Sequence, residues 1–330
     1  MISVTSKTLQ DLEFHTILHT ISERCNTDLG KQKALEITPF KDAESLLPVL
    51  NQTSEYLASF TNNNAIPNHG FEAIAKELQL LNIEDSYLDV ASFHKISGLT
   101  ATAITLLQFL DKFKEYYPAL HTKSSQLNIV KAIIKHIEEI FDKYGEVKDN
   151  ASPDLLNIRR NIQLLRGKIN QSFGLALSQY NSAGYLDDIK ETVVDNRRVL
   201  AVLAMYRKKV KGPILGSSKT GSIIYIEPEA TFRYASEFNQ LEYEEREEII
   251  RILKQLTHTI RPYREDIAGY QEFLSDIDVI AAKAKYALKI NAILPAISVE
   301  KRLYFRDAFH PILYLNNKAK NEITHPQTIE

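Results

Sequence analysis

The chain has 330 residues, a net charge of −2 and 44% hydrophobic residues, an ordinary composition for a protein that buries a core. Its single cysteine, Cys25, excludes a disulfide framework and a cysteine-based zinc site. The N-terminus has neither the basic nor the apolar region of a signal peptide, and no apolar run reaches the roughly 18 residues of a membrane span. We therefore expect a cytoplasmic protein with no membrane contact.

The first section, residues 1–150, has the apolar spacing of a helical core bundle. Glycine and proline number only 11 each, which favours long helices over many short strands. Helices are predicted over residues 6–24 (with Ser6 or Thr8 as the cap), 42–60, 71–82, 89–116 and 126–143, with turns at Tyr117-Pro118 and Gly145. Pro48 lies inside the second of these helices, where we expect a break or a kink.

Two long helices are predicted within residues 151–262. The first, at about 152–182, has Ser152 as its N-cap, and its apolar residues recur in steps of three or four from Leu155 to Tyr180. The second, at about 229–261, repeats this pattern, with Glu245 as one charged interruption. Two helices of roughly 45 Å each are expected to pair antiparallel, as a lever.

The segment between these helices, about 185–228, is predicted to be a small β clamp at the tip of the lever. Short β-type runs stand at residues 192–194, 199–203 and 223–226, and Asp187-Asp188 is placed in a turn.

The remaining residues are predicted to leave the lever in two steps. Residues 263–300 return to the core, with a helix over 266–294. Residues 301–315 show alternating β character, and another strand is expected to start in the last residues. Residues 301–330 together are expected to start an ATPase domain, a name that rests on the family resemblance below. The predicted fold class is mainly α: a helical core bundle with a long antiparallel two-helix lever carrying a small β clamp at its tip.

The clamp segment carries a one-signed charge. Between residues 196 and 226 there are seven cations and no Asp or Glu: Arg197, Arg198, Arg207, Lys208, Lys209, Lys211 and Lys219. Such a patch on a near-neutral protein favours a phosphate backbone as its partner, and we predict these seven residues as the nucleic-acid-binding set. The alternative is that they blunt exposed strand edges against aggregation. Aromatic residues are few here, so contact with the backbone of duplex or structured nucleic acid is expected, more than base stacking.

Other motifs give no catalytic or metal site. The glycines at 216 and 221 have the spacing of a phosphate loop, but a strand-like run follows them in place of a helix. His15 and His19 could share a metal, yet no third ligand is evident, and His310 suits a turn. The acidic run at 242–248 is interpreted as a solvated, salt-bridged helix face. We predict no catalytic residue, no metal site and no cofactor in this chain, and hence no enzyme activity of its own.

Several ordered segments resemble the MutS family, and within it the anti-recombination branch sometimes called MutS II. They are residues 8–13 (TLQDLE), 24–34 (RCNTDLGKQKA), 149–162 (DNASPDLLNIRRNI), 217–228 (SSKTGSIIYIEP), 242–262, 276–287 (DIDVIAAKAKYA) and 306–313 (RDAFHPIL). The resemblance covers essentially the whole chain. It implies a helical core, a lever and a clamp, followed in the intact protein by an ATPase domain that binds ATP and Mg²⁺ and by a Smr nuclease domain. This chain therefore resembles an N-terminal fragment without the ATPase and Smr domains.

Three functions are compatible with this reading. The first is the clamp and lever of a homodimeric ATPase that acts on branched or recombination-intermediate DNA and suppresses homologous recombination. The second keeps the fold but changes the partner to the ribosome, because the resemblance also implies a link to stalled translation. The third is a structural module for dimerisation or spacing. Competition between branched DNA and ribosomes, and replacement of Arg207, Lys208 and Lys209, would discriminate among them.

Overall fold

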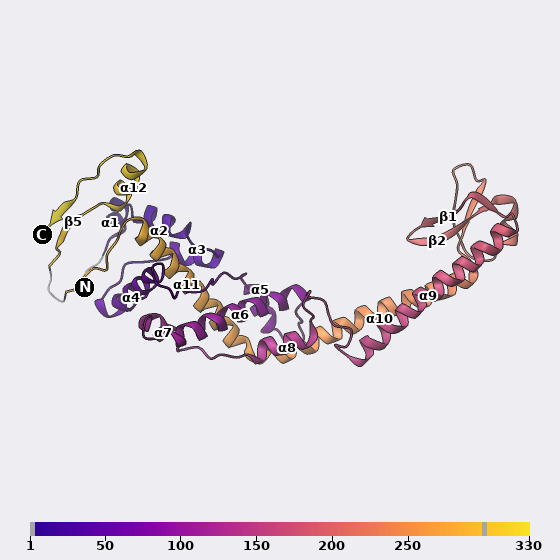
Figure 1. The fold of residues 1–330 in the computed structure, drawn as a ribbon, viewed down its shortest axis with the longest axis horizontal. Coiled ribbons are helices and arrows are strands. Elements are labelled where there is room, and N and C mark those ends of the chain that lie inside the picture. The colour runs from indigo at the N-terminus through magenta and orange to yellow at the C-terminus, as the bar shows by residue number, and fades with distance from the viewer. Residues whose placement is uncertain (1–3, 299–301) are drawn as a thin grey trace. The chain divides into compact units, whose positions relative to one another are not determined.

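The structure is a computed structural model that describes residues 4–298 and 302–330. The chain divides into two compact units: unit 1 consists of Met1–Glu138 and Leu256–Glu330, and unit 2 consists of Glu139–Gln255. Most of the described residues are helical and the strands are few and short, which confirms the mainly α fold class (Figure 1).

Unit 1 is a helical bundle organised around one helix, α11 (Arg264–Lys289), which contacts five others. The helices of its N-terminal part are α1 (Ser6–Asp11), α2 (Phe14–Ser22), α3 (Asp28–Leu35), α4 (Ala43–Ser59), α5 (Ala75–Leu81), α6 (Val90–Lys112), α7 (Pro118–Ser124) and α8 (Ala132–Ile140), whose last residues belong to unit 2. Half of the side chains of α11 are buried, among them Tyr270, Leu274 and Ala281, because it is covered from several sides.

Local backbone effects correct several predicted helices of unit 1. The helix expected over 6–24 is broken at Glu13, whose φ of 52° lies in the left-handed region, and its cap is Thr5, whose hydroxyl accepts from the backbone N–H of Thr8. Pro48 does not break α4, which runs from Ala43 to Ser59 and packs against α11. Tertiary packing therefore outweighs the hydrogen bond that proline removes.

Other predicted ranges were too long. The helices expected over 71–82, 89–116 and 126–143 are the shorter α5, α6 and α8, and Tyr117-Pro118 is the start of α7, with proline at its first position. The helix expected over 266–294 begins at Arg264 and ends at Lys289, before Pro295.

The end of the chain is predicted in part. Among the described residues from 302 onward, the strands are β5 (Phe305–Ala308), inside the stretch predicted to be β, and β6 (Gln327–Ile329), where a strand was expected to start, and they pair antiparallel. The residues from Pro311 to Leu315, expected to be β, belong to α12 (Pro311–Lys320), because His310 accepts from the backbone N–H of Leu313 and Pro311 occupies the first helical turn. The prediction for residue 301 falls outside the described residues.

Helix α6 corrects the expectation that no segment of the chain is long and apolar enough to span a membrane. By length and mean hydropathy this 23-residue helix could cross a membrane, and half of its most apolar stretch is buried inside the fold. Leu99, Leu106 and Leu110 are among its buried side chains, so in this structure α6 is a core helix of unit 1.

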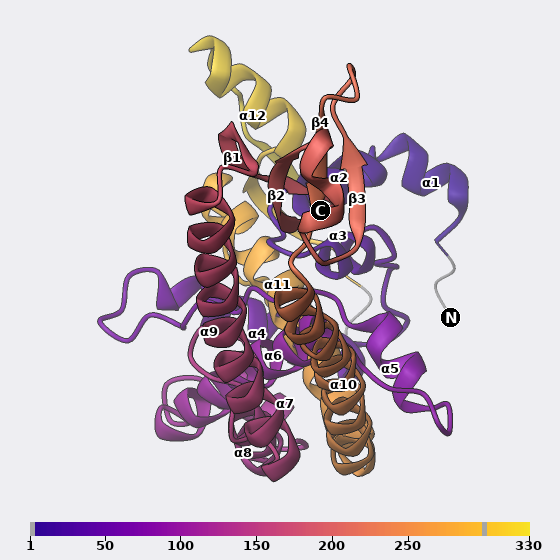
Figure 2. The ribbon, with the colours of Figure 1, turned by 90° about the vertical axis from the view of Figure 1, so that its right-hand side faces the viewer.

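Unit 2 is built on two long helices, α9 (Pro153–Ser182) and α10 (Glu229–Ile260), which we call the helix pair; the last turn of α10 belongs to unit 1. Ser152 caps α9 through its hydroxyl, which accepts from the backbone N–H of Leu155, and proline and aspartate follow in the first turn. Contacts between the helices run in opposite directions along the chain, from Ser172 with Thr231 to Arg159 with Glu245. The helices are therefore antiparallel (Figure 2).

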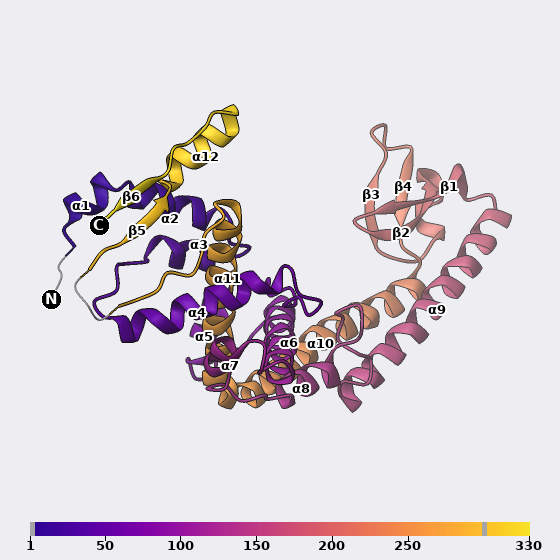
Figure 3. The same ribbon diagram turned by 60° about the vertical axis from the view of Figure 1, so that its left-hand side comes forward.

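A four-stranded antiparallel sheet joins the two helices where α9 ends and α10 begins (Figure 3). Its strands are β1 (Leu186–Val194), β2 (Arg197–Leu203), β3 (Ile214–Ser217) and β4 (Ile223–Ile226), in the order β1-β2-β4-β3. Asp187 and Asp188 lie in β1 and not in a turn, which corrects the prediction. The turn is instead Asp195-Asn196, both with positive φ, as the right-handed twist of a two-residue hairpin requires.

One face of this sheet packs on α9. Leu200, Val202 and Ile226 form a buried cluster with Phe173 of α9, which has no exposed surface. Val210 joins the same cluster from the segment after β2. The sheet and the end of the helix pair thus share one apolar core.

Candidate nucleic-acid interface

The structure separates the seven predicted cations into two groups. Arg197 and Arg198 lie in β2, and each has a carboxylate partner. The other five, which we call the exposed cations, are Arg207, Lys208 and Lys209 of the 3₁₀ helix η1 (Ala204–Lys209), Lys211, and Lys219 between β3 and β4. Among the described residues, none of the five takes part in an ion pair.

Arg197 serves the fold. Its Nη1 lies 3.2 Å from Oε2 of Glu227, whose side chain is only 2% exposed, and its guanidinium stands 6.0 Å from the ring centre of Phe232 at the start of α10. A carboxylate this deeply buried requires a partner. Arg197 therefore satisfies Glu227 and ties β2 to α10.

Arg198 also stabilises the fold, on the face of the sheet that packs on α9. Its guanidinium stands 4.2 Å from the ring centre of Phe173 in α9, and its Nη2 lies 2.7 Å from Oε2 of Glu191 in β1. Both acidic partners, Glu191 and Glu227, stand just outside the acid-free segment 196–226. Strand pairing brings them beside these arginines, so the local charge is lower than the sequence indicates.

The exposed cations are presented by a fixed backbone. The ring of Tyr206, inside η1, stacks on Tyr185 with centres 4.8 Å apart, and Tyr185 stacks in turn on Tyr180 of α9 at 6.4 Å. The backbone N–H of Ala204 donates to the carbonyl of Ser222 at 2.9 Å, and Val210 is 5% exposed. The 3₁₀ helix is thus held at both ends. The sequence showed few aromatic residues here because two of the stacked tyrosines precede the strands.

Close backbone approach fixes the path of the chain on both sides of Lys211. A Cβ on Gly212 would lie 1.8 Å from the carbonyl oxygen of Glu227, so no larger residue fits at this position without a shift. The backbone N–H of Glu229, the first residue of α10, donates to the carbonyl of Lys211 at 3.0 Å. Lys211 is therefore held against the start of α10, while its side chain remains exposed.

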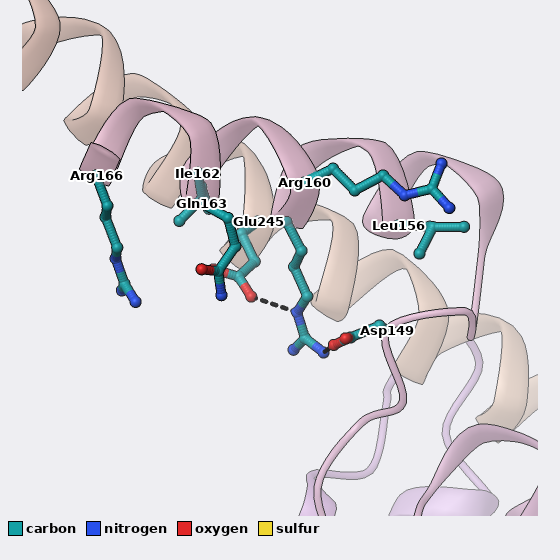
Figure 4. Close-up of a pocket in the computed structure, with 8 residues that line it drawn as sticks. Asp149, Leu156, Arg160, Ile162, Gln163, Arg166 and Glu245 are labelled. Atoms are coloured by element: carbon teal, nitrogen blue, oxygen red, sulfur yellow. Dashed lines mark hydrogen bonds and ion pairs between the residues drawn. The ribbon is translucent and has the colours of Figure 1, made fainter. Parts of the chain in front are cut away.

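Charged contacts also join the two helices near the start of α9. Nε of Arg159 donates to Oε1 of Glu245 at 2.7 Å, and its Nη1 lies 2.5 Å from Oδ1 of Asp149 (Figure 4). These residues line a groove of about 300 Å³, into which Gln163 and Arg166 also project. The charged interruption of the α10 pattern at Glu245 is thus the partner of an arginine in α9.

A second polar contact ties the start of α9 to α10. The Ser152 hydroxyl donates to Oε1 of Glu248 at 2.5 Å, and Arg251 also donates to this carboxylate. These donors, Arg251 first, hold the pKa of Glu248 below its usual range. The acidic run at 242–248 was predicted to be a solvated, salt-bridged face. Glu245 and Glu248 do form salt bridges, but they contact α9 or its N-cap and are not fully solvated.

The other sequence motifs are the glycine-containing segment around Lys219 and the pair His15 and His19. The segment from Gly216 to Gly221 runs from the end of β3 into the connection to β4, and no helix begins there. His19 lies 3.6 Å from Glu23. Residues 4–298 and 302–330 contain no group of three or more His, Cys, Asp or Glu side chains that could hold a metal ion.

Unit 1 contains a buried charged cluster that the sequence analysis missed. Asp278 of α11 has no exposed surface and accepts from the backbone N–H of Asn26 at 2.9 Å, and from both the N–H and the hydroxyl of Thr27. Nε2 of His69, itself 3% exposed, lies 3.5 Å from the same carboxylate. Burial alone would raise the pKa of Asp278, but His69, Asn26 and Thr27 hold it below the usual range.

Two neighbours show how tightly this cluster is packed. A Cβ on Gly30 would lie 2.3 Å from Oδ2 of Asp278, so α3 approaches the carboxylate with glycine at the contact. Burial, and to a smaller extent the charge of Asp278, raises the pKa of the Cys25 thiol to about 12. Cys25 therefore stays protonated and acts as a small apolar side chain. The cluster fixes the start of α3 to α11.

Comparison with known proteins gives a consistent set of relatives. A protein named Endonuclease MutS2 from Alkaliphilus oremlandii is 28% identical over 320 residues, covering 96% of this chain and 40% of the relative. One of the same name from Carboxydothermus hydrogenoformans is 31% identical over 312 residues, covering 94% of this chain and 39% of its own length. The Putative endonuclease MutS2 of Bacillus subtilis is 27% identical over 320 residues, covering 96% and 41%. No family model matches the chain. The chain thus spans about two fifths of the length of these relatives.

Proposed function

The chain is a homologue of the MutS2 proteins, and from this premise we propose that unit 2 is the nucleic-acid-binding clamp of a MutS-like protein, with the helix pair as its lever. The partner is the phosphate backbone of branched or recombination-intermediate DNA, and the role of the whole protein is to suppress recombination. It acts as a homodimer, and ATP with Mg²⁺ is bound by the part of the protein that this chain does not span.

One observation carries the proposal. Five cations are exposed on the sheet end of unit 2 without an ion-pair partner among the described residues, and a stacked and hydrogen-bonded backbone holds the 3₁₀ helix that bears three of them. Cations that only solubilise a surface need no such support. Cations that bind phosphates gain from it, because their positions are set before binding.

The salt dependence of binding tests this proposal. Each phosphate contact contributes about 0.9 to the slope of log K against log salt concentration, so five contacts predict a slope of about −4.5 and all seven predicted cations would give about −6. A slope near the smaller value supports the division of the seven cations into two groups. Binding of a labelled four-way junction that does not respond to salt would contradict the proposal.

A triple variant locates the interface. Arg207→Gln, Lys208→Gln and Lys209→Gln together are expected to reduce the salt slope by about 2.7. The control removes two charges from α10 instead, through Arg233→Gln and Arg246→Gln, and should leave the slope unchanged. A fall of about 1.8 in the control, two thirds of that in the triple variant, would show that net charge alone is responsible. No loss in either would favour the structural, spacer interpretation.

Ribosomal RNA presents the same phosphate chemistry to the exposed cations. A competition experiment decides between branched DNA and ribosomal RNA. Unlabelled four-way junction or purified ribosomes are added to the complex of the chain with labelled junction, and release of the label is measured. Displacement by ribosomes at concentrations well below those of the junction would reassign the partner to the ribosome. The phosphate-binding role of the exposed cations would stand in either case.

A further inference from the structure

Met205 is an unexpected residue on the surface of unit 2. It lies in η1 directly before Tyr206 and the three cations, and its side chain is 77% exposed. A large apolar side chain at this exposure gains nothing from the fold of its own chain. Its neighbours Tyr206 and Val210, in contrast, are turned into the cluster on α9.

The geometry of η1 groups Met205 with a cation. In a 3₁₀ helix, side chains three residues apart lie on one face, and the rise of about 2.0 Å per residue separates them by roughly 6 Å. Met205 and Lys208 therefore project from the same face of η1, with Arg207 and Lys209 on either side of Lys208. An apolar tip next to cations matches a nucleic acid, in which apolar base faces lie beside phosphates.

The support of η1 suits insertion of this tip. The stack of Tyr206 on Tyr185 and the hydrogen bond from Ala204 to Ser222 fix the backbone on the side of η1 away from solvent. A side chain that enters a base step must resist being pushed back, because unstacking the step costs about a few kcal/mol. A mobile loop would yield under that load, whereas η1 is braced against the end of α9.

We propose that Met205 is a specificity-determining residue that enters an unstacked base step of the nucleic acid while the exposed cations hold the flanking phosphates. This inference rests on the function proposed above and adds the feature that is recognised. An intact duplex resists opening, whereas a branch point has base pairs that are already poorly stacked. Met205 therefore favours branched or distorted nucleic acid over a continuous duplex.

The test compares two ligands of equal length and charge, a four-way junction and a linear duplex, with the full 330-residue chain. Met205→Ala is expected to lower the preference for the junction on the order of tenfold, since most of the apolar contact is lost, without changing the salt slope. Met205→Leu retains an apolar tip and should retain the preference. Ile189→Ala, which truncates a side chain 68% exposed on β1, is the matched control and should behave as the unaltered chain.

A spectroscopic measurement reports the insertion itself. A 2-aminopurine base placed at the branch point brightens when it is unstacked, and we expect this increase with the unaltered chain and with Met205→Leu, but not with Met205→Ala. An unchanged junction preference in Met205→Ala, or an equal loss for junction and duplex, would overturn the inference. The inference would also be overturned if Met205→Ala weakened only binding to anionic phospholipid vesicles, or only self-association. Met205 would then contact a membrane or a second copy of the chain.

Failure of this inference is distinguishable from failure of the proposed function. If the triple variant at Arg207, Lys208 and Lys209 loses affinity while Met205→Ala keeps the junction preference, the phosphate interface stands and the insertion is wrong. If neither nucleic acid binds the unaltered chain, both are wrong. Thermal unfolding of each variant checks its fold, and Met205→Ala should unfold as the unaltered chain does because the side chain is exposed.

Discussion

The buried carboxylate of unit 1 and the exposed cations of unit 2 use charge in opposite ways. Asp278 has no exposed surface, accepts hydrogen bonds from Asn26 and Thr27, and lies 3.5 Å from His69. Arg207, Lys208 and Lys209 are exposed and have no carboxylate partner among the described residues. The comparison teaches that the partners of a charged group, and not its type, indicate whether it stabilises the fold or is available to a ligand.

Arg197 and Arg198 belong with Asp278 in this comparison, although they are neighbours of the exposed cations in the sequence. Both are engaged by carboxylates and aromatic rings of their own unit. Variants can therefore be ordered by how much of their effect falls on stability and how much on binding.

The largest expected effect is that of Asp278→Ala. The substitution leaves the N–H groups of Asn26 and Thr27 buried without an acceptor, and we expect a loss of about 3–5 kcal/mol in the stability of unit 1. Hydrogen exchange resolved by segment is the measurement: amides of α11 should lose protection and those of α9 should not. Asp276→Ala is the control, because Asp276 pairs with the part-exposed Lys33 and Lys123 and should cost much less.

The same residue predicts a pH dependence. The pKa of Asp278 is lowered in the folded chain from its ordinary value of 3.8, so its contribution to stability is present above about pH 4 and is lost as the pH falls through the lower, folded pKa. The protection of α11 should decline over this acidic range. Asp278→Asn should remove this part of the decline, and an unchanged profile in that variant would refute the assignment.

Arg197→Gln is expected to have the next largest effect. It leaves Glu227, at 2% exposure, without its charged partner, which predicts a loss of about 1–3 kcal/mol in the stability of unit 2. Thermal unfolding measures this loss. If Arg197→Gln keeps its stability and its salt slope falls by about 0.9, Arg197 binds a phosphate. It would then belong with the exposed cations, and the division of the seven cations would be wrong.

Ser152→Ala tests whether the polar contacts at the start of α9, away from the sheet, stabilise the fold as those of Asp278 do in unit 1. The variant removes the N-cap of α9 and the donor to Glu248, with an expected cost of about 1 kcal/mol. Urea unfolding quantifies it, and Ser152→Asp, which restores a cap but places a second carboxylate near Glu248, should not recover the full loss. Where both the unaltered chain and Ser152→Ala are folded, they should bind nucleic acid with the same affinity.

Lys219→Gln is expected to have the smallest effect. The side chain is exposed in the connection between β3 and β4, so stability should not change. The salt slope should fall by about 0.9, which corresponds to one phosphate contact. An unchanged slope would limit the interface to η1 and Lys211.

Elements specified by neighbouring residues were predictable from the sequence. The helix predicted over 152–182 corresponds to α9, Pro153–Ser182, because its cap, first proline and apolar period are all local signals. Strand β3 and the full length of β1 were missed because their own apolar patterns are weak, although each pairs with a strand that is near in the chain. The break at Glu13 and the helix at Pro311 were missed for another reason: both depend on local backbone and capping effects, which the spacing of apolar residues does not report.

For the candidate site, the sequence by itself determined which residues are cationic and that no acid interrupts them between 196 and 226. Only the tertiary structure decided which of these cations are neutralised, since strand pairing brings Glu191 to Arg198 and Glu227 to Arg197. It also decided that Met205 faces solvent while Tyr206 is stacked. Charge is a property of each residue, whereas exposure and partnership depend on segments that the folded chain brings together.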